Sequence, residues 1–232
     1  MSAELPQRVL GLVTIGQSPR DDILPQMLPF LPAGATVWQA GALDGLTREQ
    51  IAELAPAPGD YVLHTRVRDG SAVTVGRRQL LPRVQACLDR LAAGGANPIL
   101  LLCTGELPGL TFPGLLIEPD RLLASVVHGF RPRRLGVLLP LSSQVEAVAE
   151  KWRSVAPDLI LECASPYGSD DDVRRAAAAL AGGRPDLVVM DCMGYTARHK
   201  GLVADLCGCP VILAASLLAR LTAELLDRVT CQ

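Results

Sequence analysis

The chain has 232 residues, of which 49% are hydrophobic and 3% aromatic, and its formal net charge is −2. This length suits one large α/β domain or two lobes that share a core. Few aromatic side chains and no basic excess argue against base stacking and phosphate neutralisation, so we expect no nucleic-acid partner. The longest apolar runs are shorter than a membrane helix and the N-terminal stretch lacks the order of a signal peptide, so we expect a cytoplasmic protein without a membrane partner.

Apolar runs of strand length alternate with segments of helical period in the first half of the chain. The first helix would be capped by Ser18, with Pro19 in its first turn. Asp69–Gly70 is typical of a hairpin turn, and Pro82 would bend or restart the helix that follows. In chain order we expect a strand at 8–16, a helix at 18–31, a strand at 35–43, a short helix capped by Thr47, a hairpin at 60–76, a helix at 77–95 and a strand at 97–103.

The pattern restarts after the Pro- and Gly-rich stretch 106–119. Alternating strands and helices indicate parallel βαβ units, which bind ligands beyond the carboxyl ends of their strands. For this half we expect helices at 119–129, 143–155, 171–183, 196–207 and 216–228, and strands at 134–141, 159–165, 187–192 and 210–216.

The two halves resemble each other. Each opens with a strand that ends in a hydroxyl-bearing turn, LVTIGQSPR at 12–20 and VLLPLSSQV at 137–145, and each later has a buried strand that ends in cysteine. We therefore predict an α/β fold of two similar lobes with parallel sheets and a cleft between them. Residues 1–115 with 214–232 would form the first lobe, and residues 116–213 the second.

The chain has seven cysteines, an odd number that does not favour a disulfide framework. Cys207 and Cys209 form a lone C-x-C pair, and the three histidines are scattered, so we expect no metal site.

Cys103 and Cys192 differ from the other cysteines by their position. Both end an apolar strand and both are followed within two residues by glycine, at Gly105 and Gly194. Free N–H groups in the loops that follow would favour an anion and lower the pKa of a thiol. The alternative is that both thiols are small buried apolar groups, which is the usual state of a free cysteine.

Two thiols that face each other across a cleft suit proton transfer at a carbon next to a carboxylate. A thiolate removes the proton from one face and a thiol returns one to the other, which gives racemisation or epimerisation. Attack of one thiolate on carbon would support double-bond isomerisation, and protonation by a single thiol would support decarboxylation or C–C cleavage. A protein that binds or senses a small carboxylate without turnover is a further alternative.

Four stretches carry a resemblance to a known family: LVTIGQSPRDD at 12–22, GRRQLLPRVQ at 76–85, LLLCTG at 100–105 and DCMGYTARHK at 191–200. Over essentially its whole length the chain resembles the AroM family, relatives of the aspartate/glutamate/hydantoin racemase superfamily. The resemblance implies two lobes related by a pseudo-twofold axis, a site between them and cysteine chemistry without a cofactor. It also implies that Cys103 and Cys192 are the catalytic cysteines.

Two departures from the superfamily pattern bear on the substrate. Thr104 follows Cys103 directly, whereas amino-acid racemases typically have Asn-Thr there; this is closer to the maleate isomerase and arylmalonate decarboxylase branch. Met193 stands where a threonine usually follows the second cysteine. A carboxylate-binding hydroxyl is thus missing, which disfavours an α-amino acid substrate.

The remaining candidate residues would bind a small carboxylate substrate. Ser18 and Ser142 have the alternative role of helix caps, Arg20 and His199 read as surface residues, and Asp191 would orient the loop of Cys192. The pattern leaves a homo-oligomer open. The predicted substrate-binding residues are Thr14, Gln17, Ser18, Arg77, Thr104, Gly105, Ser142, Met193, Gly194 and Tyr195.

Overall fold

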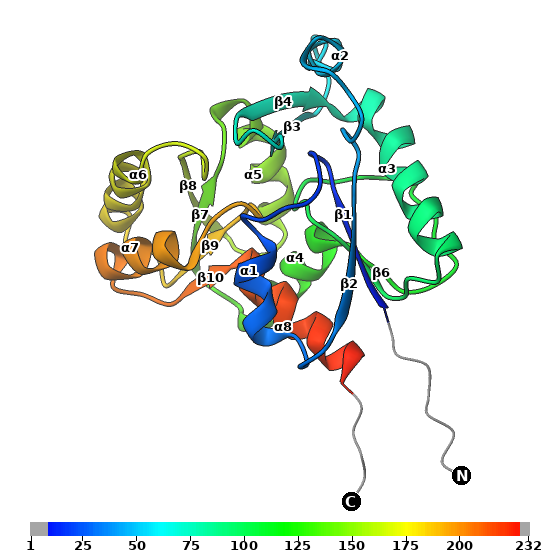
Figure 1. Ribbon diagram of the computed structural model, residues 1–232. Coiled ribbons are helices and arrows are strands. Elements are labelled where there is room, and N and C mark those ends of the chain that lie inside the picture. Colours follow the sequence, from blue (N-terminus) through cyan, green and yellow to red (C-terminus); the bar gives the residue numbers. More distant parts are fainter. Residues whose placement is uncertain (1–8, 228–232) are drawn as a thin grey trace, which may run out of the picture.

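The computed structural model describes residues 9–227, and it contains two four-stranded parallel sheets (Figure 1). Read from one edge, the first sheet has the order β2-β1-β5-β6, and the second, read in the matching direction, has the order β8-β7-β9-β10. The two lobes therefore repeat one topology, which confirms the predicted fold. The strands are β1 (Val9–Thr14), β2 (Thr36–Gly41), β5 (Ile99–Leu101), β6 (Leu116–Ile117), β7 (Arg134–Leu139), β8 (Asp158–Cys163), β9 (Leu187–Met190) and β10 (Val211–Leu213).

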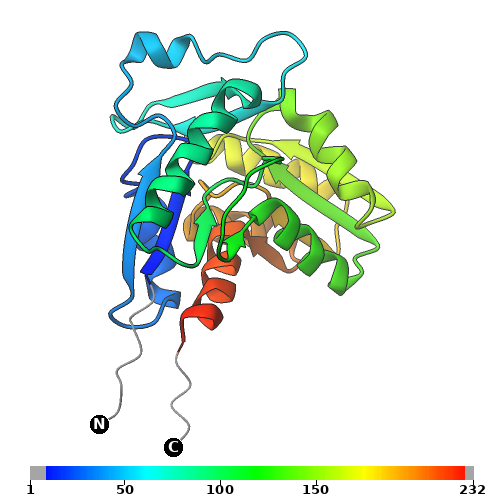
Figure 2. The same cartoon turned by 90° about the vertical axis from the view of Figure 1, so that its right-hand side faces the viewer.

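The helices cover both faces of each sheet (Figure 2). Along β1, Leu10 and Leu12 face a core shared with the second lobe, whereas Val13 faces the core beneath α3. The shared core also contains α4 and α8, and a third core lies under α6 and α7. The helical segments are α1 (Leu24–Met27), η1 (Leu28–Phe30), α2 (Arg48–Ala52), α3 (Arg77–Ala93), α4 (Pro119–Phe130), η2 (Ser142–Gln144), α5 (Val145–Arg153), α6 (Asp170–Gly182), α7 (Ala197–Cys207) and α8 (Ala214–Leu226).

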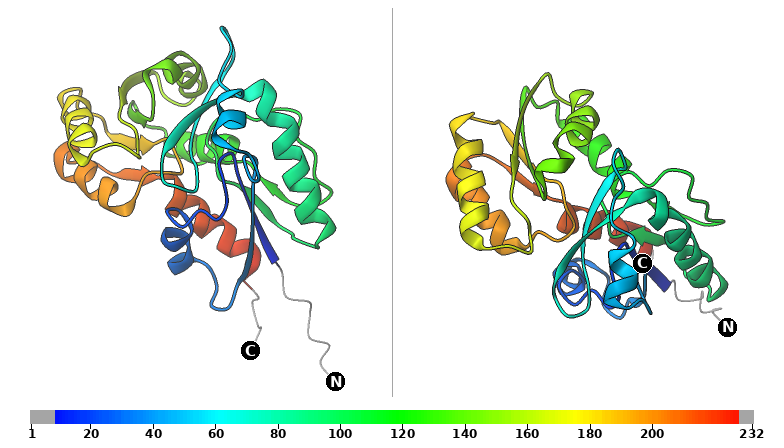
Figure 3. Two further views of the ribbon diagram at one scale, coloured as in Figure 1. Left: turned by 45° about the horizontal axis from the view of Figure 1, so that its top comes forward. Right: turned by 90° about the horizontal axis from the view of Figure 1, so that it is seen from above.

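An antiparallel hairpin of β3 (Val62–Arg66) and β4 (Ala72–Gly76) joins the first lobe to the second (Figure 3). His64 Nε2 lies 2.9 Å from Ser165 Oγ of the second lobe, and Gln144 Nε2 donates to the carbonyl of Val62 at 3.0 Å. The hairpin was predicted from its alternating strands and Asp-Gly turn, and both are present.

The predicted helix at 18–31 is wrong in its first part. Ser18 caps no helix, because its N–H and hydroxyl both donate to the carboxylate of Asp44, and the N–H of Arg20 donates to Gln39. Residues 18–20 are irregular, residues 21–23 form a turn, and the helical segments begin only at Leu24. The capping box of Thr47 is confirmed, and α3 continues through Pro82 as one helix.

The strand expected at 97–103 ends at Leu101, so Cys103 lies in the loop beyond it, and the short strand β6 in the Pro- and Gly-rich stretch was not predicted. None of the helices within 9–227 is both long and apolar enough to cross a membrane. The predictions that fall on 1–8 and 228–232, including Cys231, lie outside the described residues. The lobe boundaries stay a prediction, since α8 packs against α1 and η1 as well as α4 and β10.

Gly16, at the turn after β1, has no room for a side chain. A Cβ there would lie 2.3 Å from the carbonyl oxygen of Arg66 and 2.5 Å from Thr65 Oγ1. We expect Gly16→Ala to lower the free energy of unfolding by about 1–3 kcal/mol, because the backbone of the hairpin must move. Gly129→Ala in α4 is the control, since nothing lies within 4 Å of its added Cβ and alanine favours a helix. Urea denaturation measures both; equal effects would contradict the prediction.

Candidate active site

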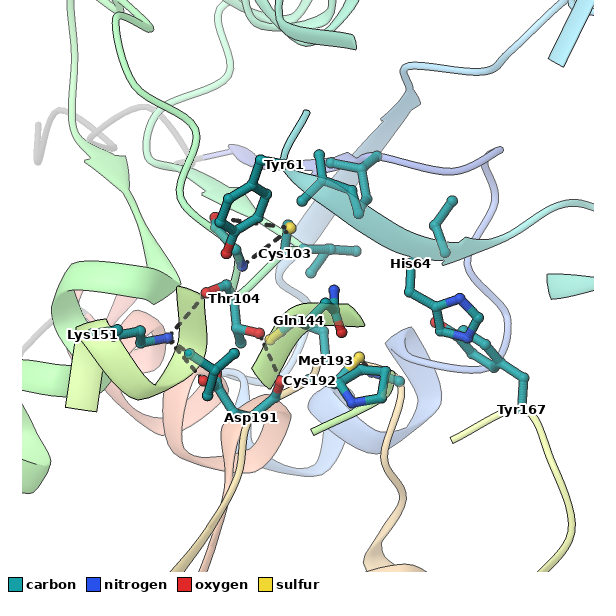
Figure 4. Close-up of a pocket in the computed structure, with 18 of the residues that line it drawn as sticks. Tyr61, His64, Cys103, Thr104, Gln144, Lys151, Tyr167, Asp191, Cys192 and Met193 are labelled. Carbon is teal, nitrogen blue, oxygen red and sulfur yellow. Dashed lines mark hydrogen bonds and ion pairs between the residues drawn. The ribbon is translucent and has the colours of Figure 1, made fainter. Parts of the chain in front are cut away.

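A pocket of about 40 Å³ lies between the two lobes, at the carboxyl ends of the central strands (Figure 4). It has room for a few water molecules or a small polar group. Cys103 and Cys192 both line it, one from each lobe, as the strand pattern predicts. The other polar side chains of the lining come from several elements of both lobes: Arg20, Tyr61, His64, Thr65, Thr104, Gln144, Lys151, Tyr167 and Asp191.

Each pocket cysteine sits in a short loop directly beyond a central strand, β5 or β9. The N–H of Gly105 donates to the sulfur of Cys103 at 3.3 Å, and the N–H of Gly194 donates to that of Cys192 at 3.5 Å. The loops are therefore equivalent in the two lobes, and each glycine places a backbone donor on its thiol. Gly194 also allows close packing, since a Cβ there would lie 2.6 Å from the hydroxyl of Tyr167.

Burial keeps both thiols protonated at neutral pH. It raises the pKa of Cys103 to about 12 and that of Cys192 to about 11. The glycine N–H groups lower both pKa values, as do Lys151 for Cys103 and Arg20 for Cys192, but desolvation outweighs them. The loop amides thus lower both pKa values, as the sequence predicts, but the net pKa of each thiol is raised by burial. In the unfolded chain the two thiols ionise at a lower pH than in the folded protein. The folded state therefore loses stability as the pH rises above ~8.5.

The cysteine loops are joined by a buried network around Lys151. Its ammonium donates to the carbonyl of Thr104 at 3.1 Å and to the Asp191 carboxylate at 3.1 Å, and it pairs with Asp120 at 3.1 Å. The Thr104 hydroxyl donates to the carbonyl of Asp191 at 3.0 Å, and the indole N–H of Trp152 donates to the Asp191 carboxylate at 2.8 Å. Asp191 thus orients the loop of Cys192, and acceptors of three residues, Thr104, Asp120 and Asp191, engage the three N–H groups of Lys151.

Arg20 is buried, only 3% exposed, and not the surface residue that the sequence indicates. Its guanidinium donates twice to Asp22, once to Thr14 Oγ1 and once to the hydroxyl of Tyr167, and these bonds hold it against the pocket. An arginine has five N–H groups, so one on Nη1 has no partner among the described residues. The Tyr167 oxygen accepts from Arg20, which leaves its own proton for another acceptor.

The structure brings six of the predicted site residues to the pocket, namely Cys103, Thr104, Gly105, Cys192, Met193 and Gly194. Three other candidates from the first lobe serve the scaffold. Thr14 accepts from Arg20, Gln17 bonds the carbonyls of Leu43 and Leu46, and Ser18 bonds Asp44.

The remaining three candidates also lie outside the pocket lining. Ser142 is exposed in η2, and Arg77 pairs with Glu106 while its guanidinium lies 4.5 Å from the ring centroid of Tyr61. Tyr195 is fully buried and donates to the carbonyl of Ala164 at 2.5 Å. His199 is not a surface residue either, since it is 6% exposed and completes the capping box of Thr196.

Several lining residues escaped the sequence analysis, and some had a usable signal. Arg20, Gln144 and Tyr167 all lie in the segments that follow β1, β7 and β8, where α/β proteins bind ligands. Lys151 lies three residues after the buried Val148, on one face of α5. His64 and Thr65 had no such signal, because only the tertiary structure places the hairpin over the pocket.

A sequence model described as "AroM protein" matches residues 10–226, nearly the whole described chain. The chain belongs to the AroM family. A comparison of this AroM-family chain with curated proteins gave no match.

Solved structures with the same fold include racemases and an isomerase. The aspartate racemase of Picrophilus torridus is 12% identical, with a TM-score of 0.63 and 94% of each chain covered. The allantoin racemase from Klebsiella pneumoniae is 13% identical, with a TM-score of 0.65, 94% of this chain and 87% of that chain covered. The maleate cis-trans isomerase of Nocardia farcinica, solved with a covalently bound succinylcysteine intermediate, is 17% identical, with a TM-score of 0.58, 95% of this chain and 93% of that chain covered. This AroM protein therefore shares the fold of these racemases and of this isomerase.

Removal of the Lys151 ammonium should destabilise the protein. Lys151→Met leaves the Asp191 carboxylate, 2% exposed, without its cation, so we expect a loss of about 3–5 kcal/mol in the free energy of unfolding. Lys200→Met is the matched control, since no ion pair holds Lys200 within the described part of the chain. Urea denaturation compares the two variants. A loss below about 1 kcal/mol for Lys151→Met would contradict the role of the network.

Alkylation of the pocket thiols should report their raised pKa values. We expect the iodoacetamide rate at Cys103 and Cys192 to rise about tenfold per pH unit through pH 10, because the thiolate is the nucleophile. Cys192, with the lower pKa, should react ahead of Cys103. Peptide-resolved mass spectrometry follows each cysteine against free N-acetylcysteine; a plateau at either site below about pH 9, as for an ordinary thiol, would refute the expectation.

Proposed function

We propose that this AroM-family protein is a cofactor-independent racemase or isomerase of a small carboxylate-bearing molecule. Cys103 and Cys192 would be its acid/base pair. The observation that carries the proposal is that both cysteines line one pocket, each from the equivalent loop of its own lobe and each with a glycine N–H on its sulfur. The fold that this chain shares with racemases and isomerases supports it.

Proton transfer would begin from the thiolate of Cys192. Arg20 favours that thiolate, and Cys192 has the lower pKa of the two thiols. The thiolate takes the proton next to the substrate carboxylate, and the neutral thiol of Cys103 returns a proton to the opposite face. The proton count balances, since one thiol is regenerated as the other ionises. The low-dielectric pocket that raises both pKa values also makes each thiolate a stronger base.

The free donors of the pocket would hold the substrate carboxylate and its enediolate. Arg20 offers one N–H on Nη1 and Tyr167 offers its hydroxyl proton. Both groups are held by other bonds before any ligand arrives, so they require little reorganisation as negative charge develops. Met193 provides no hydroxyl here, and its role would be to keep the inner wall apolar.

The binding or sensing protein is the second candidate, and the neutral state of both thiols favours it. Both thiols stay protonated at neutral pH, so substrate binding would have to lower the pKa of one of them before that thiol could act as a base. A protein of this kind would use the same donors and the same pocket without turnover.

Alanine at each cysteine separates these functions. We expect Cys103→Ala and Cys192→Ala each to slow racemisation about 10²- to 10⁴-fold, since each removes one partner of the acid/base pair. Deuterium incorporation from D₂O into a panel of small 2-substituted carboxylates, followed by NMR, measures this. Cys87→Ala is the control, because Cys87 is buried outside the pocket.

The outcomes are distinct. Loss with only one of the two variants would indicate a one-thiol decarboxylase or C–C lyase. No exchange by the wild-type protein, together with ligand-dependent thermal stabilisation that survives alanine at both positions, would indicate the binding protein.

A further inference from the structure

One wall of the pocket carries buried polar atoms that have no hydrogen-bond partner. Within residues 9–227, four buried side-chain atoms have no hydrogen-bond partner: His64 Nδ1, Thr65 Oγ1, Gln144 Oε1 and Thr222 Oγ1. The first three belong to residues that line the pocket, whereas Thr222 lies on α8. Buried polar atoms in folded proteins almost always have partners, so their concentration at one pocket points to a polar ligand.

Gln144 shows which kind of group this ligand must present. Its Nε2 donates to the carbonyl of Val62 at 3.0 Å, which fixes the amide and leaves Oε1 as the group without a partner. A carbonyl oxygen only accepts hydrogen bonds, so its partner must carry an N–H or O–H. Thr65, 1% exposed, adds a hydroxyl without a partner on the adjoining hairpin strand.

Donors without a partner are also present in the pocket. Arg20 has one N–H on Nη1 beyond its bonds to Asp22, Thr14 and Tyr167, and the Tyr167 hydroxyl accepts from Arg20 with its own proton still available. The pocket therefore offers donors at Arg20 and Tyr167 and an acceptor at Gln144. A ligand with only acceptors, such as a second carboxylate facing Gln144, would set two acceptors against each other.

We propose that the substrate is a small carboxylate that also carries a neutral hydrogen-bond donor, a hydroxyl or an amide N–H, at the carbon next to the carboxylate. The inference rests on the proposed function, since it names the substrate class of that same pocket. The carboxylate binds Arg20 and Tyr167, and the donor binds Gln144 Oε1. An ammonium is a poorer match, because Asp191, the carboxylate of the lining, is already paired with Lys151 and Asp22 is already paired with Arg20.

Binding of four compounds of similar size tests the substrate class without turnover. Lactate carries the hydroxyl, propanoate lacks it, 2-methoxypropanoate keeps the oxygen but not the donor, and alanine carries an ammonium. Titration calorimetry on the full chain at pH 7 should give at least tenfold tighter binding for lactate than for each of the other three. A site built around a substrate donor rejects analogues that lack it, because its own acceptor is left unpaired.

The Gln144→Met variant tests the residue. We expect the ratio of lactate to propanoate affinity to fall below threefold in Gln144→Met, and to be unchanged in Gln79→Met, an exposed glutamine of α3. Only the ratio is diagnostic, because lost interlobe contact at Val62 would weaken both ligands together.

Equal binding of lactate and propanoate by the wild-type protein, no binding of any of the four, or a ratio that survives Gln144→Met would each overturn the inference. The ratio should persist in Cys103→Ala and Cys192→Ala, because recognition does not use the thiols. Failure of the proposed function would appear separately, as absent deuterium exchange with the lactate preference intact.

Discussion

The pocket of this AroM-family protein depends on one partly buried ammonium group that belongs to neither cysteine loop. Lys151 bonds the carbonyl of Thr104 in the first lobe and the carboxylate of Asp191 in the second, and Asp120 supplies the third acceptor. Thr104 and Asp191 are each the immediate neighbour of a pocket cysteine, and Asp120 lies on α4, between the sheets. A charge removed from water needs complete pairing, so the network tolerates few arrangements of the two loops. The positions of the two sulfurs follow from that constraint.

The two lobes repeat one topology, but their connections differ, and this difference makes the pocket asymmetric. The first lobe inserts the hairpin β3–β4 between β2 and α3, whereas the second lobe has only a short loop between β8 and α6. These equivalent connections meet above the pocket, where His64 contacts both Ser165 and the ring of Tyr167. The two sides of the pocket consequently carry different groups, although the thiols come from equivalent loops. Such asymmetry is what a protein needs to recognise a carboxylate and a second polar group separately.

Burial has opposite consequences for the chemistry and for recognition. It raises the pKa of both thiols, which opposes the formation of the thiolate that proton transfer needs. It also leaves Gln144 Oε1 and Thr65 Oγ1 without hydrogen-bond partners, which would favour a ligand able to pair with them. In the proposed function, the same pocket would therefore restrict the substrate and make the ionisation of its thiols depend on what the substrate brings.

The sequence by itself determined the alternation of strands and helices, the repeat of the two halves and the position of Cys103 and Cys192 at the carboxyl-end edge of the sheets, because these follow from local periodicity and chain order. It could not determine whether Ser18 caps a helix or serves Asp44, since both uses satisfy a short hydroxyl equally well. The tertiary structure alone decided three features of the site. These are the burial of Arg20, the place of His64 and Thr65 in the pocket lining, and the pairing of Lys151 with Asp191. Each of them depends on contacts between segments far apart in the chain, and neither the spacing nor the composition of a sequence specifies such contacts.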